Sequence, residues 1–274
     1  MSNKIFSDIL NRLQNKEKRW EAMLDMKFIR DECYFPFIIK ALKHPHSLTR
    51  WVMAEACQEL GLIDSISKLF DLLLDKDKQV RITAFKALKS FGLQSVGTAI
   101  KFLCHSHIAM RKAAYEIINA SDKNALPIIF DSLPDLDPLT QRRAFNFIWS
   151  LSPFDAEPYL IKGLAFEDCQ EQAILMLGQL KSTQAIIPLI NLYIFANRRN
   201  LILMAFESIG SDKVYPIIAQ NLIHPSRGKA SLLLCQKIGK VILPFIYVFL
   251  KKSSSKEVSL WKTVLSQLKN DASF

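Results

Sequence analysis

The sequence predicts an all-α fold, a right-handed α–α superhelix (solenoid) of about nine stacked helix pairs. Of its 274 residues, 50% are apolar and only 8 are glycine, which excludes a disordered chain and favours helices over a turn-rich β fold. A proline and an arginine each recur at intervals of about 30 residues. Such repetition indicates helix pairs that cover one another's apolar faces.

The proline repeat marks where the first helix of each pair begins. Proline fits the first helical turn, because its missing N–H would have no partner there. An apolar stretch of helical period follows each proline, and Pro36 lies 91 residues, or three periods, before the next member of the series. Intervals of 31, 30, 28 and 28 residues separate Pro127, Pro158, Pro188, Pro216 and Pro244.

The arginine repeat marks the second helix of each pair. Eleven residues after three of these arginines stand Gly61, Gly92 and Gly210, which predict the left-handed residue that ends a helix. Intervals of 31, 30, 31, 57 and 28 residues separate Arg50, Arg81, Arg111, Arg142, Arg199 and Arg227.

The repeats predict a single solenoid domain over residues 1–274. A divergent helical pair in 1–33 forms an N-terminal cap, about eight repeats fill 34–270, and 271–274 form a tail. No Pro-, Gly- or Ser-rich linker interrupts the chain. The expected repeats are 34–65, 66–95, 96–124, 125–156, 157–184, 185–213, 214–242 and 243–270.

The repeat at 66–95 resembles a HEAT repeat of the armadillo-type fold. Asp75 stands in its turn and Arg81 six residues later, the two positions whose side chains form a ladder across successive HEAT repeats. A period near 30 is similar to the short bacterial form, the phycobilisome-lyase type. The resemblance implies a fold and leaves the function open, since the superfamily hosts scaffolds, lyases and DNA-repair enzymes. Other turns depart from this pattern. A histidine replaces the aspartate six residues before Arg50 and Arg111, at His44 and His105, and Asp137 stands six residues before Arg143.

No segment reads as a secretory signal or as an apolar run of roughly 18–20 residues, so we expect a cytoplasmic protein without a membrane span. The 5 cysteines include no CxxC pair, and we expect each of them to be buried and to act as a small hydrophobic residue. The His-x-His pairs at 44–46 and 105–107 could ligate zinc, but they fall in turns two repeats apart, roughly 20 Å. We therefore expect these histidines to replace the turn aspartate and either to cap a helix or to face water, and we expect no metal or other cofactor.

The fifth residue after each arginine mark is expected to face the concave surface. Charged residues occupy this position in the first three repeats and apolar residues in the next three, which predicts a binding surface for a protein or peptide. The alternative is a register shift of one residue, which would make the apolar three part of the core. The candidates are Glu55, Lys86, Glu116, Phe147, Leu175 and Met204, with Leu175 counted from Gln170.

The formal charge of +10 is unevenly distributed. Residues 66–124 carry +5, residues 125–184 carry −4 and residues 214–274 carry +7. A basic surface at the C-terminal end could hold a phosphate backbone. Its candidates are Arg227, Lys229, Lys237, Lys240, Lys251 and Lys252.

These patterns support a non-enzymatic scaffold or adaptor that binds a protein or peptide on its concave face. Catalytic motifs such as GxSxG, a Walker loop, GxGxxG or HExxH are missing, although a solenoid can assemble a site from distant side chains. Two alternatives remain open. The resemblance implies bilin attachment or a bilin chaperone, as in phycobilisome lyases, and the basic surface predicts nucleic-acid binding. The sequence leaves the oligomeric state open.

Overall fold

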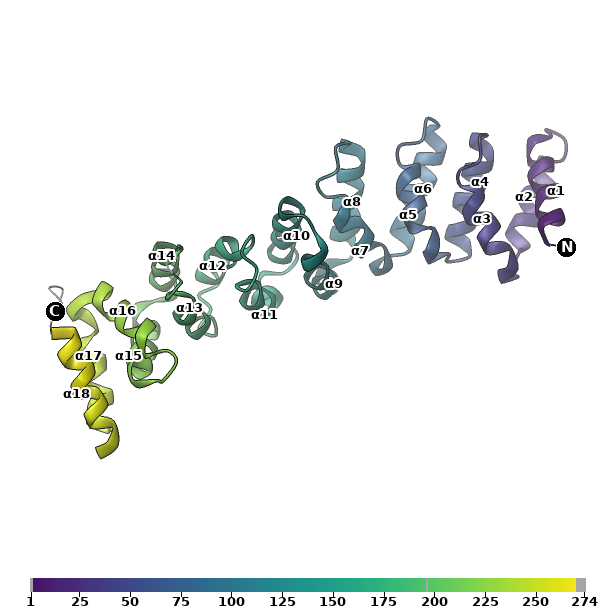
Figure 1. Cartoon of the computed structure of the whole chain (residues 1–274). Helices are drawn as coiled ribbons and strands as arrows, with labels where there is room; N and C mark the ends of the chain where they lie inside the picture. The colour runs from purple at the N-terminus through teal and green to yellow at the C-terminus, as the bar shows by residue number, and fades with distance from the viewer. Residues whose placement is uncertain (1, 196, 270–274) are drawn as a thin grey trace. The chain divides into compact units, whose positions relative to one another are not determined.

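The computed structural model describes residues 2–195 and 197–269, and the regular elements in this part of the chain are all helical. The chain divides into two compact units, Met1–Leu151 and Ser152–Phe274. Each unit is a stack of helix pairs joined by short turns (Figure 1). The all-α fold of repeated helix pairs is confirmed, whereas one continuous domain stays a prediction.

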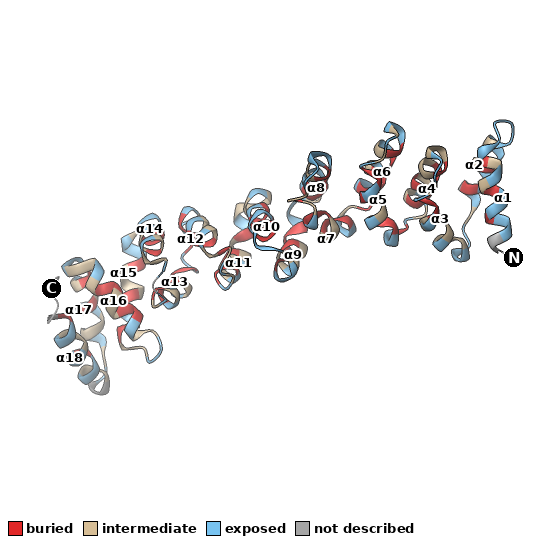
Figure 2. Cartoon of the chain, turned by 45° about the horizontal axis from the view of Figure 1, so that its top comes forward, coloured by how far each residue is buried: buried red, intermediate tan, exposed pale blue. Residues whose placement is uncertain are grey.

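In the first unit, the second helices of successive pairs lie in one row and the first helices in another (Figure 1). Buried residues, red in Figure 2, recur along every helix of the unit, because each pair covers the apolar face of its neighbour. The helices are α1 (Ser2–Gln14), α2 (Arg19–Phe28), α3 (Phe35–Ala41), α4 (Ser47–Glu59), α5 (Ile66–Leu72), α6 (Lys78–Ser90), α7 (Leu93–Lys101), α8 (Ile108–Ala120), α9 (Leu126–Ser132) and α10 (Pro138–Leu151).

The second unit also stacks helix pairs, which fall close to the predicted repeats, although two of the pairs begin before the expected boundaries at 157 and 214. The helices are α11 (Pro153–Gly163), α12 (Gln170–Gln179), α13 (Ile186–Leu192), α14 (Arg199–Ile209), α15 (Ser211–Gln220), α16 (Gly228–Ile238), α17 (Leu243–Lys252) and α18 (Ser255–Lys269), with the 3-10 turn η6 (Gly239–Ile242) between α16 and α17.

The proline marks locate most helix starts correctly. Pro36, Pro127 and Pro244 lie in the first turns of α3, α9 and α17, as predicted. The prediction is wrong for Pro158 and Pro216, which lie inside α11 and α15. The start of α11 moves back toward residue 153 because Ser152 caps this helix, its hydroxyl accepting a hydrogen bond from the Asp155 N–H.

In five repeats the eleventh residue after the repeat mark is left-handed where the second helix ends, whereas Ser152 in the fourth repeat is extended, with a φ of −161°. Gly61, Gly92 and Gly210 have φ values of 64°, 55° and 112°, which confirms their predicted role. The eleventh residue after the repeat mark is left-handed even without glycine, with φ of 51° at Asp122 and 54° at Lys181. The turn geometry therefore belongs to the repeat rather than to the glycine.

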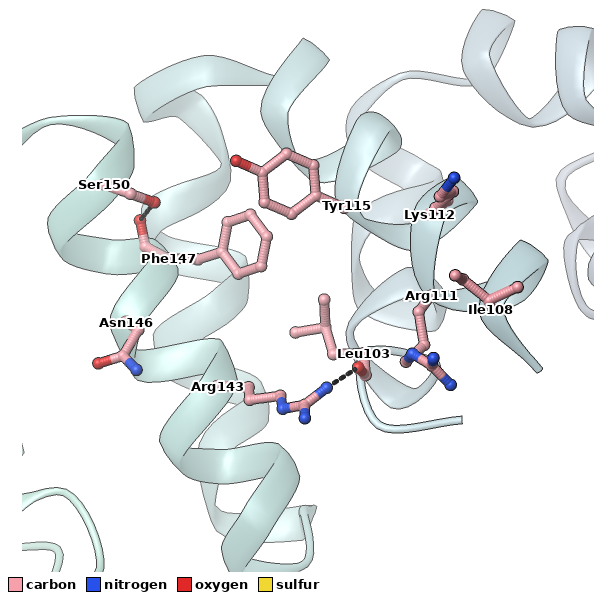
Figure 3. A pocket seen from close by; sticks show the side chains of 9 residues that line it. All are labelled: Leu103, Ile108, Arg111, Lys112, Tyr115, Arg143, Asn146, Phe147 and Ser150. Carbon is pink, nitrogen blue, oxygen red and sulfur yellow. Dashed lines mark hydrogen bonds between the residues drawn. The ribbon is translucent and has the colours of Figure 1, made fainter. Parts of the chain in front are cut away.

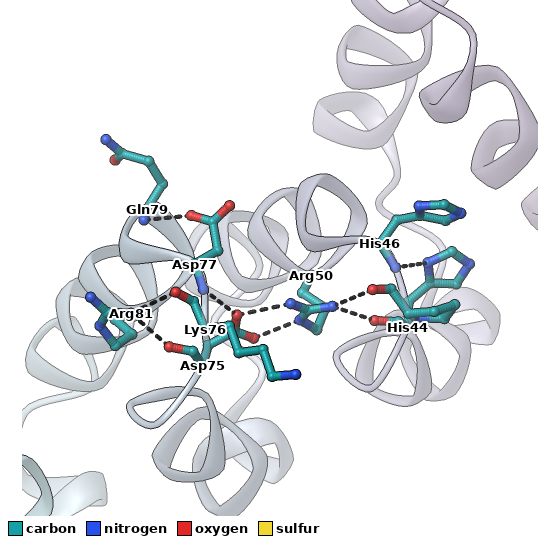
Figure 4. A network of polar contacts seen from close by, with 9 residues as sticks. His44, His46, Arg50, Asp75, Lys76, Asp77, Gln79 and Arg81 are labelled. Atoms are coloured by element: carbon teal, nitrogen blue, oxygen red, sulfur yellow. Dashed lines mark hydrogen bonds and ion pairs between the residues drawn. The ribbon is translucent and has the colours of Figure 1, made fainter.

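The arginine mark ties α4 and α6 to the turns before them (Figure 4). A terminal nitrogen of Arg50 donates to the carbonyls of His44 and Pro45, both at 2.7 Å. Arg81 bonds in the same way to the carbonyls of Asp75 and Lys76, at 2.7 and 3.0 Å. These carbonyls lie in the turn between the two helices, where the backbone has no helical partner to satisfy it.

A bond of this kind also corrects the register of α10. The amide of Gln141 is buried and donates to the Leu133 carbonyl at 2.9 Å, while Arg142 is exposed. Gln170 bonds to the Leu164 carbonyl at 2.8 Å in α12. Gln141, and not Arg142, is therefore the equivalent of Arg50 in the fourth repeat.

The Asp–Arg ladder has one complete rung in the first unit. The guanidinium of Arg50 contacts both carboxylate oxygens of Asp75, at 2.6 and 2.8 Å, and thereby joins two successive repeats (Figure 4). Arg81 and Arg111 contact no carboxylate in the described part of the chain. The ladder ends because His105 stands where Arg81 would meet an aspartate.

The turn histidines replace the turn aspartate, as predicted. The Asp75 carboxylate accepts a hydrogen bond from the Asp77 N–H at 2.9 Å. The Nδ1 atoms of His44 and His105 accept in the same way from the backbone N–H groups of His46 and His107, both at 3.2 Å. Within residues 2–195 and 197–269, no three His, Cys, Asp or Glu side chains lie close enough to hold a metal ion.

The cysteines are not uniformly buried. Cys57, Cys169 and Cys235 lie in the core, and burial raises the pKa of Cys57 to about 11. Cys33 is exposed and Cys104 is partly exposed, so the expectation of buried cysteines is wrong at these two positions. Cys33 is exposed because it lies in the connection between the first two pairs.

One stretch, Gly228–Lys252, is long and apolar enough to cross a membrane by length and composition. In this fold it forms α16 and α17, which the 3-10 turn η6 separates. The stretch therefore serves as two shorter helices of the second unit.

Neighbouring second helices approach most closely where the facing residues are small. In the second unit, α12 and α14 pack tightly at Gly178, where an added Cβ would meet the Ala205 Cα at 2.9 Å. In the first unit, α4 and α6 also pack closely and carry the buried small residues Ala56 and Ala87. Ala56, Ala87 and Ala205 are each the sixth residue after their repeat mark.

We predict that Gly178→Ala lowers the free energy of unfolding by about 1 kcal/mol or more, since the new methyl group meets backbone. Gly97→Ala is the matched control, because a Cβ there meets only the Ile128 Cγ2 at 3.8 Å. The control should gain up to about 1 kcal/mol from helix propensity. Urea unfolding followed by circular dichroism measures the free energy of unfolding of both variants. An equal gain in stability in the two variants would contradict the close approach of α12 and α14 at Gly178.

We also predict that Asp75→Asn lowers the free energy of unfolding by about 1–3 kcal/mol at pH 7, because it removes the carboxylate partner of Arg50. Arg50 holds the pKa of Asp75 below its ordinary value of 3.8. The stabilisation is therefore complete above pH 3.8 and is lost as the pH falls through the lower folded pKa. Unfolding measured against pH should show the two chains converging in acid, while the exposed control Asp71→Asn changes little.

Candidate functional site

Five of the six predicted binding residues share one register position. Glu55 is half-buried, Lys86 and Glu116 are exposed, and in the second unit Leu175 and Met204 are 41% and 54% exposed. They lie on successive second helices, α4, α6 and α8 in one unit and α12 and α14 in the other. Their role in binding a partner stays a prediction.

Phe147 does not belong to this series. Counted from Gln141, the fifth position in α10 is Asn146, which is exposed, whereas Phe147 is the sixth and is only 7% exposed. The predicted switch from charged to apolar residues therefore begins at Leu175, one repeat later. The shift of one residue arises because a glutamine replaces the arginine mark and Arg142 stands beside it.

Phe147 nevertheless lines a cavity of the first unit, which we call the α8–α10 groove (Figure 3). Its volume is about 520 Å³. The lining residues are Leu103 from the turn before α8, Ile108, Arg111, Lys112 and Tyr115 from α8, and Arg143, Asn146, Phe147 and Ser150 from α10.

The residue at the sixth position after the repeat mark distinguishes α10 from α4, α6 and α14. This position holds Ala56, Ala87 and Ala205 where second helices approach closely, and it holds Phe147 in α10. A phenylalanine side chain is too large for the close packing that alanine permits. We attribute the wider separation of α8 and α10, which lack the close packing of α4 and α6, to this ring.

The floor of the groove is apolar and aromatic. The rings of Tyr115 and Phe147 lie 5.0 Å apart between centroids, at an interplanar angle of 56°. Their rings point toward the same space, with the Leu103 side chain between them and the guanidinium of Arg143 (Figure 3). Tyr115 is 53% exposed, so this contact fixes its ring while leaving half of its surface available to a partner.

Three cationic side chains stand around this floor. Arg143 donates to the Leu103 carbonyl at 3.0 Å, which ties α10 to the preceding repeat. Arg111 donates to the carbonyls of its own turn, at His105 and Ser106, and Lys112 is exposed. No carboxylate lines the groove.

The predicted basic surface lies on α16, η6 and α17 of the second unit. Arg227 donates to the Asn221 side chain at 3.0 Å and is partly buried. Lys229, Lys237, Lys240, Lys251 and Lys252 are exposed. Nucleic-acid binding by these residues stays a prediction.

Sequence reasoning missed Tyr115 and Arg143, which the fold brings to one site. Tyr115 is the fourth residue after Arg111, so a search of the fifth position in each repeat does not select it. A sequence feature does mark the site, since phenylalanine occupies a register position that three other repeats fill with alanine. That feature becomes visible only after Gln141 is recognised as the repeat mark.

The family comparison matches residues 4–89 to the model described as HEAT repeats. This segment spans α1 through most of α6, so the chain carries HEAT-like repeats over this part of the first unit. The match includes the pair in 1–33 that the sequence predicts only as a divergent cap. No curated protein matches the chain.

Several solved structures are similar. The complex of CpcE and CpcF of phycocyanin lyase from Nostoc sp. PCC7120 is 19% identical, with 77% of this chain and 91% of that chain covered and a TM-score of 0.33. Human deoxyhypusine hydroxylase in complex with glycerol is 15% identical, with 90% and 96% covered and a TM-score of 0.35. An engineered protein is 15% identical, with 96% and 98% covered and a TM-score of 0.31. Similarities of this size say nothing about what this chain binds.

Proposed function

We propose that the chain is a non-enzymatic HEAT-repeat adaptor that holds a segment of a partner protein in the α8–α10 groove. The observation that carries the proposal is the 520 Å³ cavity with an apolar floor between two adjacent second helices. A cavity of this size accepts one or two large apolar side chains. Such side chains commonly anchor a partner segment in a groove. Under this proposal the partner lies on the row of second helices, where the sequence predicts binding.

The residues of the groove have the distribution of an interaction site. Leu103 and Phe147 are buried and supply a fixed floor, 5% and 7% exposed. Tyr115 offers a large exposed ring at low conformational cost, and residues of this type dominate binding energies at interfaces. Asn146 and Ser150 provide polar groups at the rim.

The groove is held open by contacts that exist without a partner. The Tyr115–Phe147 ring contact and the bond from Arg143 to the Leu103 carbonyl both cross from the third repeat to the fourth. A partner therefore meets a site whose side chains are already ordered, which lowers the entropy cost of binding.

We predict that Tyr115→Ala weakens partner binding at least tenfold, because it removes the exposed half of the aromatic floor. The probe is a displayed library of random linear peptides selected on the immobilised full chain, with affinities then measured by fluorescence anisotropy. Tyr247→Ala is the matched control, since Tyr247 is 48% exposed and lies in the second unit. It should alter the affinity by less than about twofold.

Two outcomes would contradict the proposed function. The selection could yield no binding peptides, or the selected peptides could bind Tyr115→Ala as tightly as the unchanged chain. Thermal unfolding of both variants shows whether the fold is kept, which we expect because Tyr115 is largely exposed.

A further inference from the structure

The charge around the α8–α10 groove is of one sign. Arg111, Lys112 and Arg143 line it, and none of its lining residues is acidic. A second cavity, in the other unit, has a volume of about 460 Å³ and is lined by one acid and one base, Glu207 and Lys237. A cavity of about 470 Å³ elsewhere in the first unit is also lined by lysines without an acid, Lys40 and Lys43. The α8–α10 groove is distinguished by an exposed aromatic ring, that of Tyr115, beside its three cations.

We infer that the segment held by the α8–α10 groove is an acidic peptide, in which an Asp or Glu lies within one helical turn of a large apolar anchor. This inference rests on the proposed function and adds the chemistry of the partner. The spacing follows from the groove, since Lys112 and Tyr115 are three residues apart on α8 and Arg143 and Phe147 are four apart on α10. Each helix therefore presents a cation one turn from an aromatic ring.

The cations retain hydrogen-bonding capacity for such a partner. The ammonium of Lys112 is exposed and has no acceptor in the described part of the chain. Arg143 uses one terminal nitrogen for the Leu103 carbonyl, and its other N–H groups have no acceptor among the described residues. A carboxylate can accept from a guanidinium and an ammonium together, and such bonds are stronger than neutral ones.

Nearby acids do not cancel this charge. The Asp137 carboxylate is engaged within its own turn. Hydrogen bonds from the Thr140 side chain and N–H, and from the Leu139 N–H, hold the pKa of Asp137 below its ordinary value. Glu116 is exposed one turn after Lys112 and does not line the groove. The groove consequently favours an anionic partner and disfavours a basic one.

An acidic peptide suits the groove better than a nucleic acid. Base stacking requires a free aromatic face, and Phe147 is buried against Tyr115 and Leu103. Tyr115 alone retains an exposed ring here. A large apolar side chain can instead enter the cavity and leave the carboxylate at the rim with Lys112 and Arg143.

The test uses the peptide selection on the full chain with three readouts: the composition of the selected peptides, their affinity for charge variants, and their dependence on salt. Tyr115-dependent peptides should be rich in Asp and Glu beside Leu, Ile, Phe or Trp. Lys112→Glu should weaken them about tenfold, and raising the salt concentration should weaken them further. Lys101→Glu is the matched control, because Lys101 is exposed on α7 outside the groove and the change in net charge is the same.

The failures of the two proposals are distinguishable. If Tyr115-dependent peptides are selected but show no acidic bias, or bind Lys112→Glu and Lys101→Glu equally, the groove binds peptides and the acidic assignment is wrong. If no Tyr115-dependent peptide is selected, the proposed function itself fails. A parallel titration with single-stranded oligothymidylate assigns the groove to nucleic acid if that binding is lost in Tyr115→Ala.

Discussion

The distance between adjacent second helices is the constraint on which the candidate site of this protein depends. Every repeat must cover the apolar face of its neighbour, so the side chain at the facing position sets how closely two repeats approach. Alanine at 87 and 205 accompanies close packing of α4 with α6 and of α12 with α14. Phenylalanine at 147 stands where α8 and α10 separate and a cavity opens. A packing residue thereby creates the place where a partner can be held.

The turns keep the repeats in order while this distance varies. A side chain at the start of each second helix bonds to the turn that precedes it, whether it is the arginine at 50 or the glutamine at 141. Fewer side-chain bonds connect one repeat to the next, and their acceptors differ. Arg50 reaches the Asp75 carboxylate, whereas Arg143 reaches a backbone carbonyl at Leu103. The ion pair accompanies two closely packed helices, and the carbonyl bond accompanies the open groove.

The sequence predicts the fold far better than the site, for a physical reason. Helix starts and ends depend on local chemistry, such as a proline in the first turn at 127 or a left-handed glycine at 92, and these leave a periodic pattern. The site depends on register across repeats, where an error of one residue moves a side chain from the surface into the core. Gln141 makes the turn hydrogen bond that an arginine makes in other repeats. A register counted from the neighbouring Arg142 is therefore wrong by one residue and places Phe147 at the exposed position. The tyrosine at 115 and the arginine at 143 meet only once that register is known.

The most direct measurement is a crystal structure of Phe147→Ala beside that of the unchanged chain. If the ring at 147 holds the repeats apart, the unchanged chain contains the 520 Å³ cavity. In the variant, α8 and α10 approach as α12 and α14 do around Gly178, and the cavity disappears. A variant whose helices keep their separation, with an enlarged cavity in place of the ring, would contradict the account.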